Sequence, residues 1–161
     1  MISLTDLTTP LNPLIIALLR SRLHGIGSRQ MMVVSWTGRK SGRRFSIPVA
    51  YQREGADGRE IAVLISKVDK KRWWKNFREP WPAELLLRGR VCEAIGHWVE
   101  PGSDEYFDKI LMTFERLPWL GGQMGITYRK GEALSEEQRR VLCRECGVVR
   151  FADLTPENPT G

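Results

Sequence analysis

Short β-rich runs separated by turn residues dominate residues 30–99 of the chain. From Phe45 to Tyr51 the apolar side chains alternate strictly with the others, which is typical of a half-buried strand. Further runs cover residues 30–36, 60–65, 83–87 and 91–99, and turn residues at 55–58 and 88–90 predict two hairpins. We therefore expect an antiparallel sheet to form the body of the protein.

Helical periodicity is found after these runs. Residues 103–114 begin with N-cap residues and place apolar side chains at helical spacing. Ser135 and Gln138 resemble a capping box that opens a helix to about Arg144, and a last strand is expected over residues 148–154. A sheet with separate flanking helices indicates the α+β class.

An amphipathic N-terminal helix is also expected, over residues 13–24. Its apolar run at residues 14–19 is far shorter than the roughly 20 residues that a membrane-spanning helix needs. We expect this helix to pack on the sheet, and the alternative is peripheral contact with a membrane surface.

The length of 161 residues suits one domain with a substantial core. We expect a single domain over residues 1–161, with mobile ends at residues 1–10 and 155–161. Three cysteines are too few and too oddly placed for a disulfide framework, which favours the cytoplasm. Zinc needs four ligands, and beyond Cys143 and Cys146 only Cys92, His24 and His97 remain, so no metal site is predicted.

The net charge of +6 favours an anionic partner, and a dense group of cations lies in residues 37–44, TGRKSGRR. Two glycines in this loop allow close backbone approach, and the four cations Arg39, Lys40, Arg43 and Arg44 can meet phosphate or carboxylate. The spacing of a P-loop is absent. The loop is therefore a candidate anion-binding site, and a solvated basic hairpin is the alternative.

Two separated motifs carry a resemblance to a known family. The first is SWTGRKSG at residues 35–42, followed by Arg44 and by the strand that contains Pro48. The second is ISK at residues 65–67 with WWKNF at residues 73–77. In this order they resemble the deazaflavin-dependent nitroreductase and quinone reductase family, over about residues 13–100, with a similar closing strand at 148–156. The resemblance implies a split β-barrel of the FMN-binding, PNPOx-like kind with an N-terminal helix.

The same resemblance implies a cofactor and its site. Members bind coenzyme F420, a deazaflavin whose tail carries phosphate, lactate and glutamates. By this resemblance the residues that face the tail are Arg39, Lys40 and Arg44, and those that border the cofactor are Ser66, Lys67, Trp73, Trp74 and Asn76. The remaining members of the expected cofactor site are Thr37, Gly38, Ser41, Gly42 and Pro48.

Hydride transfer from reduced F420 to a quinone, nitroaromatic or similar flat acceptor is the expected activity. A deazaflavin transfers the hydride from its own ring, so the protein has to orient the reactants and exclude water. Tyr128, in an irregular segment at residues 117–131, is the candidate proton donor, with packing as its alternative role. We expect a small-molecule acceptor, a homodimer and no nucleic-acid partner.

One departure from the family pattern leaves alternatives open. The Gly-Gly pair common after the Ser-Lys strand end is replaced by residues 68–71, VDKK. An FMN-binding reductase, or a non-catalytic flavin-, haem- or lipid-binding protein of the same fold, therefore remains as an alternative.

Overall fold

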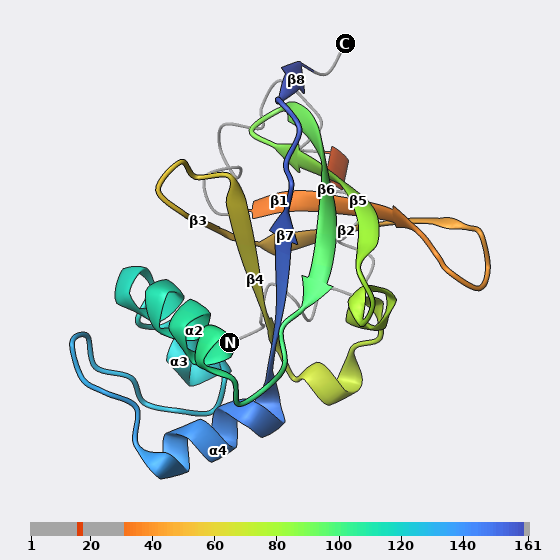
Figure 1. Ribbon diagram of the computed structural model, residues 1–161. Coiled ribbons are helices and arrows are strands. Elements are labelled where there is room, and N and C mark those ends of the chain that lie inside the picture. Colours follow the sequence, from red (N-terminus) through yellow and green to blue (C-terminus); the bar gives the residue numbers. More distant parts are fainter. Residues whose placement is uncertain (1–15, 18–30, 160–161) are drawn as a thin grey trace.

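The computed structural model describes residues 16–17 and 31–159 of the chain (Figure 1). The strands are β1 (Met31–Thr37), β2 (Arg44–Ala50), β3 (Gln52–Glu54), β4 (Glu60–Ser66), β5 (Trp81–Leu87), β6 (Arg90–Trp98), β7 (Cys146–Ala152) and β8 (Asn158–Pro159). The helices are the two 3-10 turns η2 (Val68–Lys70) and η3 (Trp73–Phe77), and α2 (Asp104–Arg116), α3 (Leu120–Gln123) and α4 (Glu136–Glu145).

The strands form one antiparallel sheet that closes on itself. They follow the order β2-β1-β5-β6-β7-β4-β3, and β8 pairs with β6 beyond the end of β7. The two strands at the ends of this order, β2 and β3, are consecutive in the chain and are separated only by Tyr51. The backbone thus joins the two ends of the sheet, and the sheet curls into a barrel.

A buried aromatic side chain from η3 fills one end of the barrel interior. Phe77 is completely buried and meets Phe151 edge to face, with the ring centroids 5.5 Å apart. Its ring lies against Gly96 on the inward face of β6, where a Cβ atom would come within 2.3 Å of Phe77. Gly96 is therefore required for this plug, because any side chain would collide with the ring.

Helices α2, α3 and α4 form a second layer on the outer face of β4 and β7 (Figure 1). Ser103 caps α2 by accepting a hydrogen bond from the backbone N–H of Tyr106, at 3.2 Å. The buried side chains shared between the helices and the sheet include Leu64, Tyr106, Ile110, Phe114, Leu142 and Val148. This apolar layer fixes the helices to one side of the barrel.

Much of the predicted secondary structure is confirmed. The hairpins β3–β4 and β5–β6 form, and α4 begins with the predicted capping box between Ser135 and Gln138. Pro48 lies on β2, which is an end strand of the sheet order, as its missing N–H requires. The helix expected over residues 13–24 lies outside the described residues except for Ile16 and Ala17, and Ile16 packs against Val33 and Leu86.

Two segments differ from the prediction. The segment at residues 117–131, expected to be irregular, contains α3. The last strand begins at Cys146, two residues before its expected start, and includes Gly147. Position 147 requires a glycine, because a Cβ atom there would come within 2.7 Å of both Trp98 and Val68. The mobility expected for residues 155–161 stays a prediction, and in the described part of this segment the N–H of Thr155 donates to the carbonyl oxygen of Glu93 at 2.9 Å.

Candidate functional site

Arg39 joins the two sequence motifs in space. Its Nε donates to the carbonyl oxygen of Asn76 at 3.0 Å, and its Nη2 donates to those of Glu79 at 2.8 Å and Pro80 at 3.0 Å. The guanidinium group also lies over the Trp81 ring, 4.0 Å from the ring centroid. The β1–β2 hairpin is therefore fastened to the segment that leads from η3 into β5.

An aromatic cluster lies beneath this junction. Trp36 stacks on Phe45 with the centroids 5.7 Å apart, and it lies 6.1 Å from Trp73 and 5.9 Å from Phe77. The indole Nε1 of Trp36 is buried and has no hydrogen-bond acceptor among the described residues. The cluster brings Trp36, near the start of the first motif, against Trp73 and Phe77 of the second motif.

Three further cations of the hairpin remain at its surface. Lys40 and Arg43 are exposed and make no ion pair within the described part of the chain. Arg44 pairs with Glu84, with 2.9 Å between Nη2 and Oε1, but both side chains are about half exposed. An exposed pair of this kind contributes little stability and can be exchanged for a ligand. The hairpin thus keeps cations available to an anion even though Nε and Nη2 of Arg39 are bound to the backbone.

A groove of about 570 Å³ runs along the outer face of β1, β5 and β6 next to the hairpin. Thr37, Arg44 and Trp81 line the part nearest the hairpin, and Ser35, whose hydroxyl lies 2.8 Å from that of Ser46, lines its floor. The groove also contains the carboxylates of Glu84, Glu93 and Asp153. Its volume is within the range of small-molecule sites, and its acidic side would repel the negatively charged part of a ligand toward Lys40 and Arg43.

The other predicted cofactor residues lie around η2 and on β2. Lys71 is buried and its Nζ donates to the carbonyl oxygen of Ser66 at 2.7 Å, while Lys67 adopts a left-handed backbone conformation with φ of 48°. The indole Nε1 of Trp74 donates to the carbonyl oxygens of Val68 and Lys71. Pro48 is buried opposite Val33, four residues along β2 from Arg44. The predicted set is thus divided between the hairpin junction and the η2 turn.

Tyr128 lies in the helical layer, apart from the aromatic cluster at the hairpin. Its ring packs against Phe114, and its hydroxyl donates a hydrogen bond to the carboxylate of Glu115. The N–H of Gly131 donates to the same carboxylate at 3.0 Å. These contacts lower the pKa of Glu115, chiefly through the Tyr128 hydroxyl, and burial raises the pKa of Tyr128.

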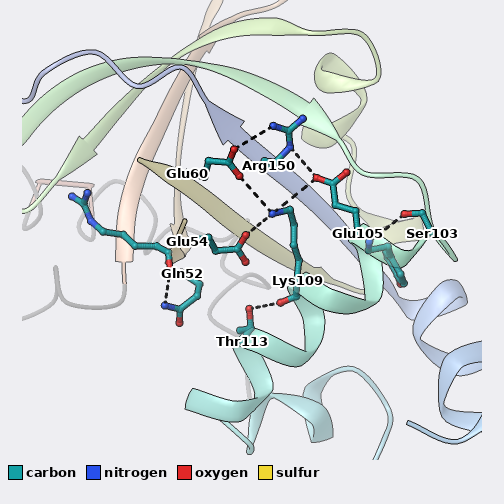
Figure 2. Close-up of polar contacts among 10 residues, drawn as sticks. Gln52, Glu54, Glu60, Ser103, Glu105, Lys109, Thr113 and Arg150 are labelled. Atoms are coloured by element: carbon teal, nitrogen blue, oxygen red, sulfur yellow. Dashed lines mark hydrogen bonds and ion pairs between the residues drawn. The ribbon is translucent and has the colours of Figure 1, made fainter. Parts of the chain in front are cut away.

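A charge network around the buried pair of Lys109 and Glu54 was missed by sequence reasoning. Figure 2 shows Lys109 of α2 pointing toward three carboxylates. Lys109 pairs closely with Glu54, and its Nζ lies 3.9 Å from Glu60 and 4.0 Å from Glu105. Arg150 of β7 adds contacts to Glu105 at 3.0 Å and Glu60 at 3.8 Å. The sequence did contain a signal for this network, because Lys109 shares the apolar face of its helix with Phe107 and Ile110. A lysine on such a face requires a buried partner of opposite charge.

The network fastens α2 to the barrel rather than forming a metal site. Lys109 and Glu54 are both almost fully buried, and Glu54 comes from the end of β3. Within residues 16–17 and 31–159, no group of three or more histidines, cysteines or carboxylates could hold a metal ion. No helix in the same described part of the chain is long and apolar enough to cross a bilayer.

Comparison with known proteins gives matches of structure only. No protein-family model matches the sequence, and no curated protein matches it either. The structure resembles that of HutZ, the haem storage protein from Vibrio cholerae, with a TM-score of 0.52, 15% identity and coverage of 92% of this chain and 96% of that chain. It resembles a domain-swapped dimer with a TM-score of 0.52, 16% identity and coverage of 77% of this chain and 81% of the other.

A third structure is a pyridoxamine 5'-phosphate oxidase-related, FMN-binding protein from Nostoc punctiforme, with a TM-score of 0.46, 9% identity and coverage of 91% of this chain and 81% of that chain. Identities this low describe the fold alone. The antiparallel sheet, whose two end strands are joined through Tyr51, and the likeness to HutZ and to the domain-swapped dimer define the fold class of this chain: it is a split β-barrel.

Proposed function

We propose that this protein binds coenzyme F420 at the β1–β2 hairpin and transfers a hydride from the reduced cofactor to a quinone, nitroaromatic or similar flat acceptor. One observation carries the proposal: Arg39 joins the TGRKSG loop to the WWKNF segment through the carbonyl group of Asn76, and to the residues just after that segment through the carbonyl groups of Glu79 and Pro80. The two motifs that carry the family resemblance are 37 residues apart between Arg39 and Asn76, yet they form one junction.

The side chains at the junction fit such a cofactor. Lys40, Arg43 and Arg44 supply exposed cations for a phosphate and carboxylates, and the adjoining groove of about 570 Å³ offers Trp81 as an apolar wall for a ring. Thr37 and Ser35 add hydroxyl groups along the groove. Arg39 acts as a positioning residue in this proposal, because its Nε and Nη2 hold the loop in place instead of facing the tail.

The bound deazaflavin supplies the hydride from its own ring. The residues of this chain have three tasks: the hairpin cations hold the tail, the groove walls orient the ring, and the apolar side chains around Trp36 keep water from the junction. Tyr128, the expected proton donor, lies in the helical layer with its hydroxyl bound to Glu115 and does not line the groove, so it has no role in this proposal.

Fluorescence titration of the purified protein with F420 tests the cofactor. We expect saturable binding in the micromolar range that weakens when Lys40 and Arg43 are both changed to alanine. The matched control is Arg129→Ala with Lys130→Ala, which removes the same charge from the loop before α4. Saturable binding of FMN with no binding of F420 would replace the proposal by an FMN-using reductase.

Haem binding is a second candidate, favoured by one residue. His97 is half buried and lines a pocket of about 430 Å³ with Arg59 and Arg150. Burial lowers the pKa of His97, and Arg150 adds to this effect, so the imidazole is neutral and able to bind iron at neutral pH. Titration with haemin is the test: a Soret shift lost in the His97→Ala variant supports this function, and absence of a shift excludes it.

Pairing of two chains is part of the proposal. One of the similar structures is a domain-swapped dimer. Sedimentation equilibrium is the measurement that distinguishes a dimer from a monomer at micromolar concentration.

A further inference from the structure

The positive charge of this chain is concentrated in two segments. Residues 37–44 and 67–80 contain ten lysines and arginines against two carboxylates, Asp69 and Glu79. Their excess of eight positive charges is larger than the net charge of +6 for the whole chain. The remainder of the sequence therefore carries a small negative excess. We call these two segments the cationic end.

The two segments form one surface in the structure. Arg39 of the first segment donates to the carbonyl oxygens of Asn76 and Glu79 in the second. Figure 1 shows the β1–β2 hairpin and the turns that lead into β5 on the side of the barrel away from α2 and α3. Exposed cations from both segments are Lys40, Arg43, Lys70, Arg72, Lys75 and Arg78. A flat partner can thus meet cations from both segments at once.

Aromatic side chains stand among these cations. Phe45, directly after the hairpin loop, keeps 41% of its surface exposed, although a phenylalanine is usually buried. Trp73 and Trp74 are half buried, and Arg78 lies over the Trp74 ring at 5.0 Å with Lys75 at 5.8 Å. Half-buried tryptophans surrounded by cations are typical of surfaces that meet the polar–apolar boundary of a membrane.

The contacts of the aromatic rings in the cationic end favour an anionic bilayer over a nucleic acid as the partner. Base stacking in a nucleic acid needs open ring faces. The Trp74 ring is already stacked on Trp98 at 4.2 Å, Trp73 packs toward Trp36 and Phe77, and Phe45 stacks on Trp36. An anionic bilayer requires only cations near its surface and an apolar side chain able to enter the headgroup region.

We propose that the cationic end is a docking surface for an anionic lipid bilayer, with Phe45 entering the headgroup region and the surrounding lysines and arginines held near the lipid phosphates. This surface does not include the helix expected over residues 13–24. Lys40 and Arg43 belong both to this surface and to the proposed cofactor site, so the test of the docking surface uses Phe45, Arg72 and Lys75, which do not line the groove.

Flotation with vesicles tests the docking surface. We expect the protein to bind phosphatidylcholine vesicles that contain phosphatidylglycerol, to ignore vesicles of phosphatidylcholine alone, and to be released by high salt. Changing both Arg72 and Lys75 to alanine should weaken binding about 30-fold, from the contribution of each cation near an anionic surface. The control, Arg129→Ala with Lys130→Ala, removes the same charge on the side of α3 and should retain binding.

A second variant separates the apolar contribution from charge. Phe45→Ser should weaken vesicle binding about tenfold, and Phe45→Trp should retain it, because both aromatic rings suit the headgroup region. Thermal unfolding of each variant verifies that it is folded. The proposal is overturned if anionic vesicles are not bound at low salt, or if both double variants lose binding equally. Binding of single-stranded DNA that is lost in the Arg72 and Lys75 variant, without vesicle binding, would also overturn it in favour of a nucleic acid.

Discussion

The guanidinium group of Arg39 lies 4.0 Å from the centroid of the Trp81 ring, while Trp81 itself donates from its indole nitrogen to the carbonyl oxygen of Thr37 at 2.8 Å. The β1–β2 loop, which contains Arg39, and the start of β5 at Trp81 are thus held together. Arg39 is therefore the hairpin cation that maintains the loop, whereas Lys40, Arg43 and Arg44 are available to a ligand.

We expect Arg39→Lys to destabilise the protein, since an ammonium group cannot reach three carbonyl oxygens in the planar geometry of a guanidinium group. The free energy of unfolding in urea should fall by about 1–2 kcal/mol. Lys40→Ala, the neighbouring change, should alter the unfolding free energy by less than about 0.5 kcal/mol but weaken F420 binding. Equal stability of both variants would contradict this division of roles.

Gly96→Ala should strain the barrel interior. The new methyl group would come 2.3 Å from the ring of Phe77, which is completely buried. We expect a loss of about 1–3 kcal/mol in the free energy of unfolding. In a Phe77→Ala background the same change should cost far less, because the two residues are coupled through one contact. Additive effects of the two substitutions would argue against the plug.

Lys109→Met should leave Glu54 buried without its cation, and both side chains are almost fully buried. Breaking a buried pair costs about 3–5 kcal/mol, measured as a lower free energy of unfolding. Replacing both partners, with Lys109→Met and Glu54→Leu, should restore most of the loss. Arg140→Ala is the matched control, because its pair with Glu137 is exposed and should change stability by less than about 1 kcal/mol.

Tyr128→Phe should raise the pKa of Glu115 toward its ordinary value, since the Tyr128 hydroxyl is the main cause of the lowered pKa. A carboxyl whose pKa is lower in the folded state stabilises the fold above its unfolded pKa, and this stabilisation is lost as pH falls through the folded pKa. The variant should therefore differ from the parent at neutral pH and approach it in acid. Carbon-13 titration of Glu115 measures the pKa, and an unchanged pKa would refute the assignment.

Local patterns predicted most of the sheet, because strand alternation and turn residues act within a few neighbouring positions. The capping box at Ser135 is likewise a local signal, and it was confirmed. The start of the last strand was placed two residues too late, at residue 148, whereas β7 begins at Cys146 and includes Gly147. A glycine is needed at position 147 because Trp98 approaches it closely, and Trp98 is 49 residues away in the sequence, so this contact leaves no local signal.

The sequence predicted which residues belong to the candidate site better than it predicted how their side chains are arranged. The TGRKSG loop and the WWKNF segment do meet, as their order in the resemblance indicated. The sequence could not show that Arg39 would bind carbonyl groups, because the backbone of residues 76–80 becomes available only when η3 ends beside the hairpin. Glu54 and Lys109 escaped notice for the same reason, being 55 residues apart.

The single residue between β2 and β3 has a consequence for engineering. Every strand pairing described for the sheet would survive a break in the chain at Tyr51, since none of the paired positions of β2 and β3 includes that residue. The two ends of the sheet are therefore held together by the covalent backbone at Tyr51. A flexible insertion at this position would allow β2 and β3 to move apart and open the barrel interior, while each hydrogen-bonded strand pair stayed intact.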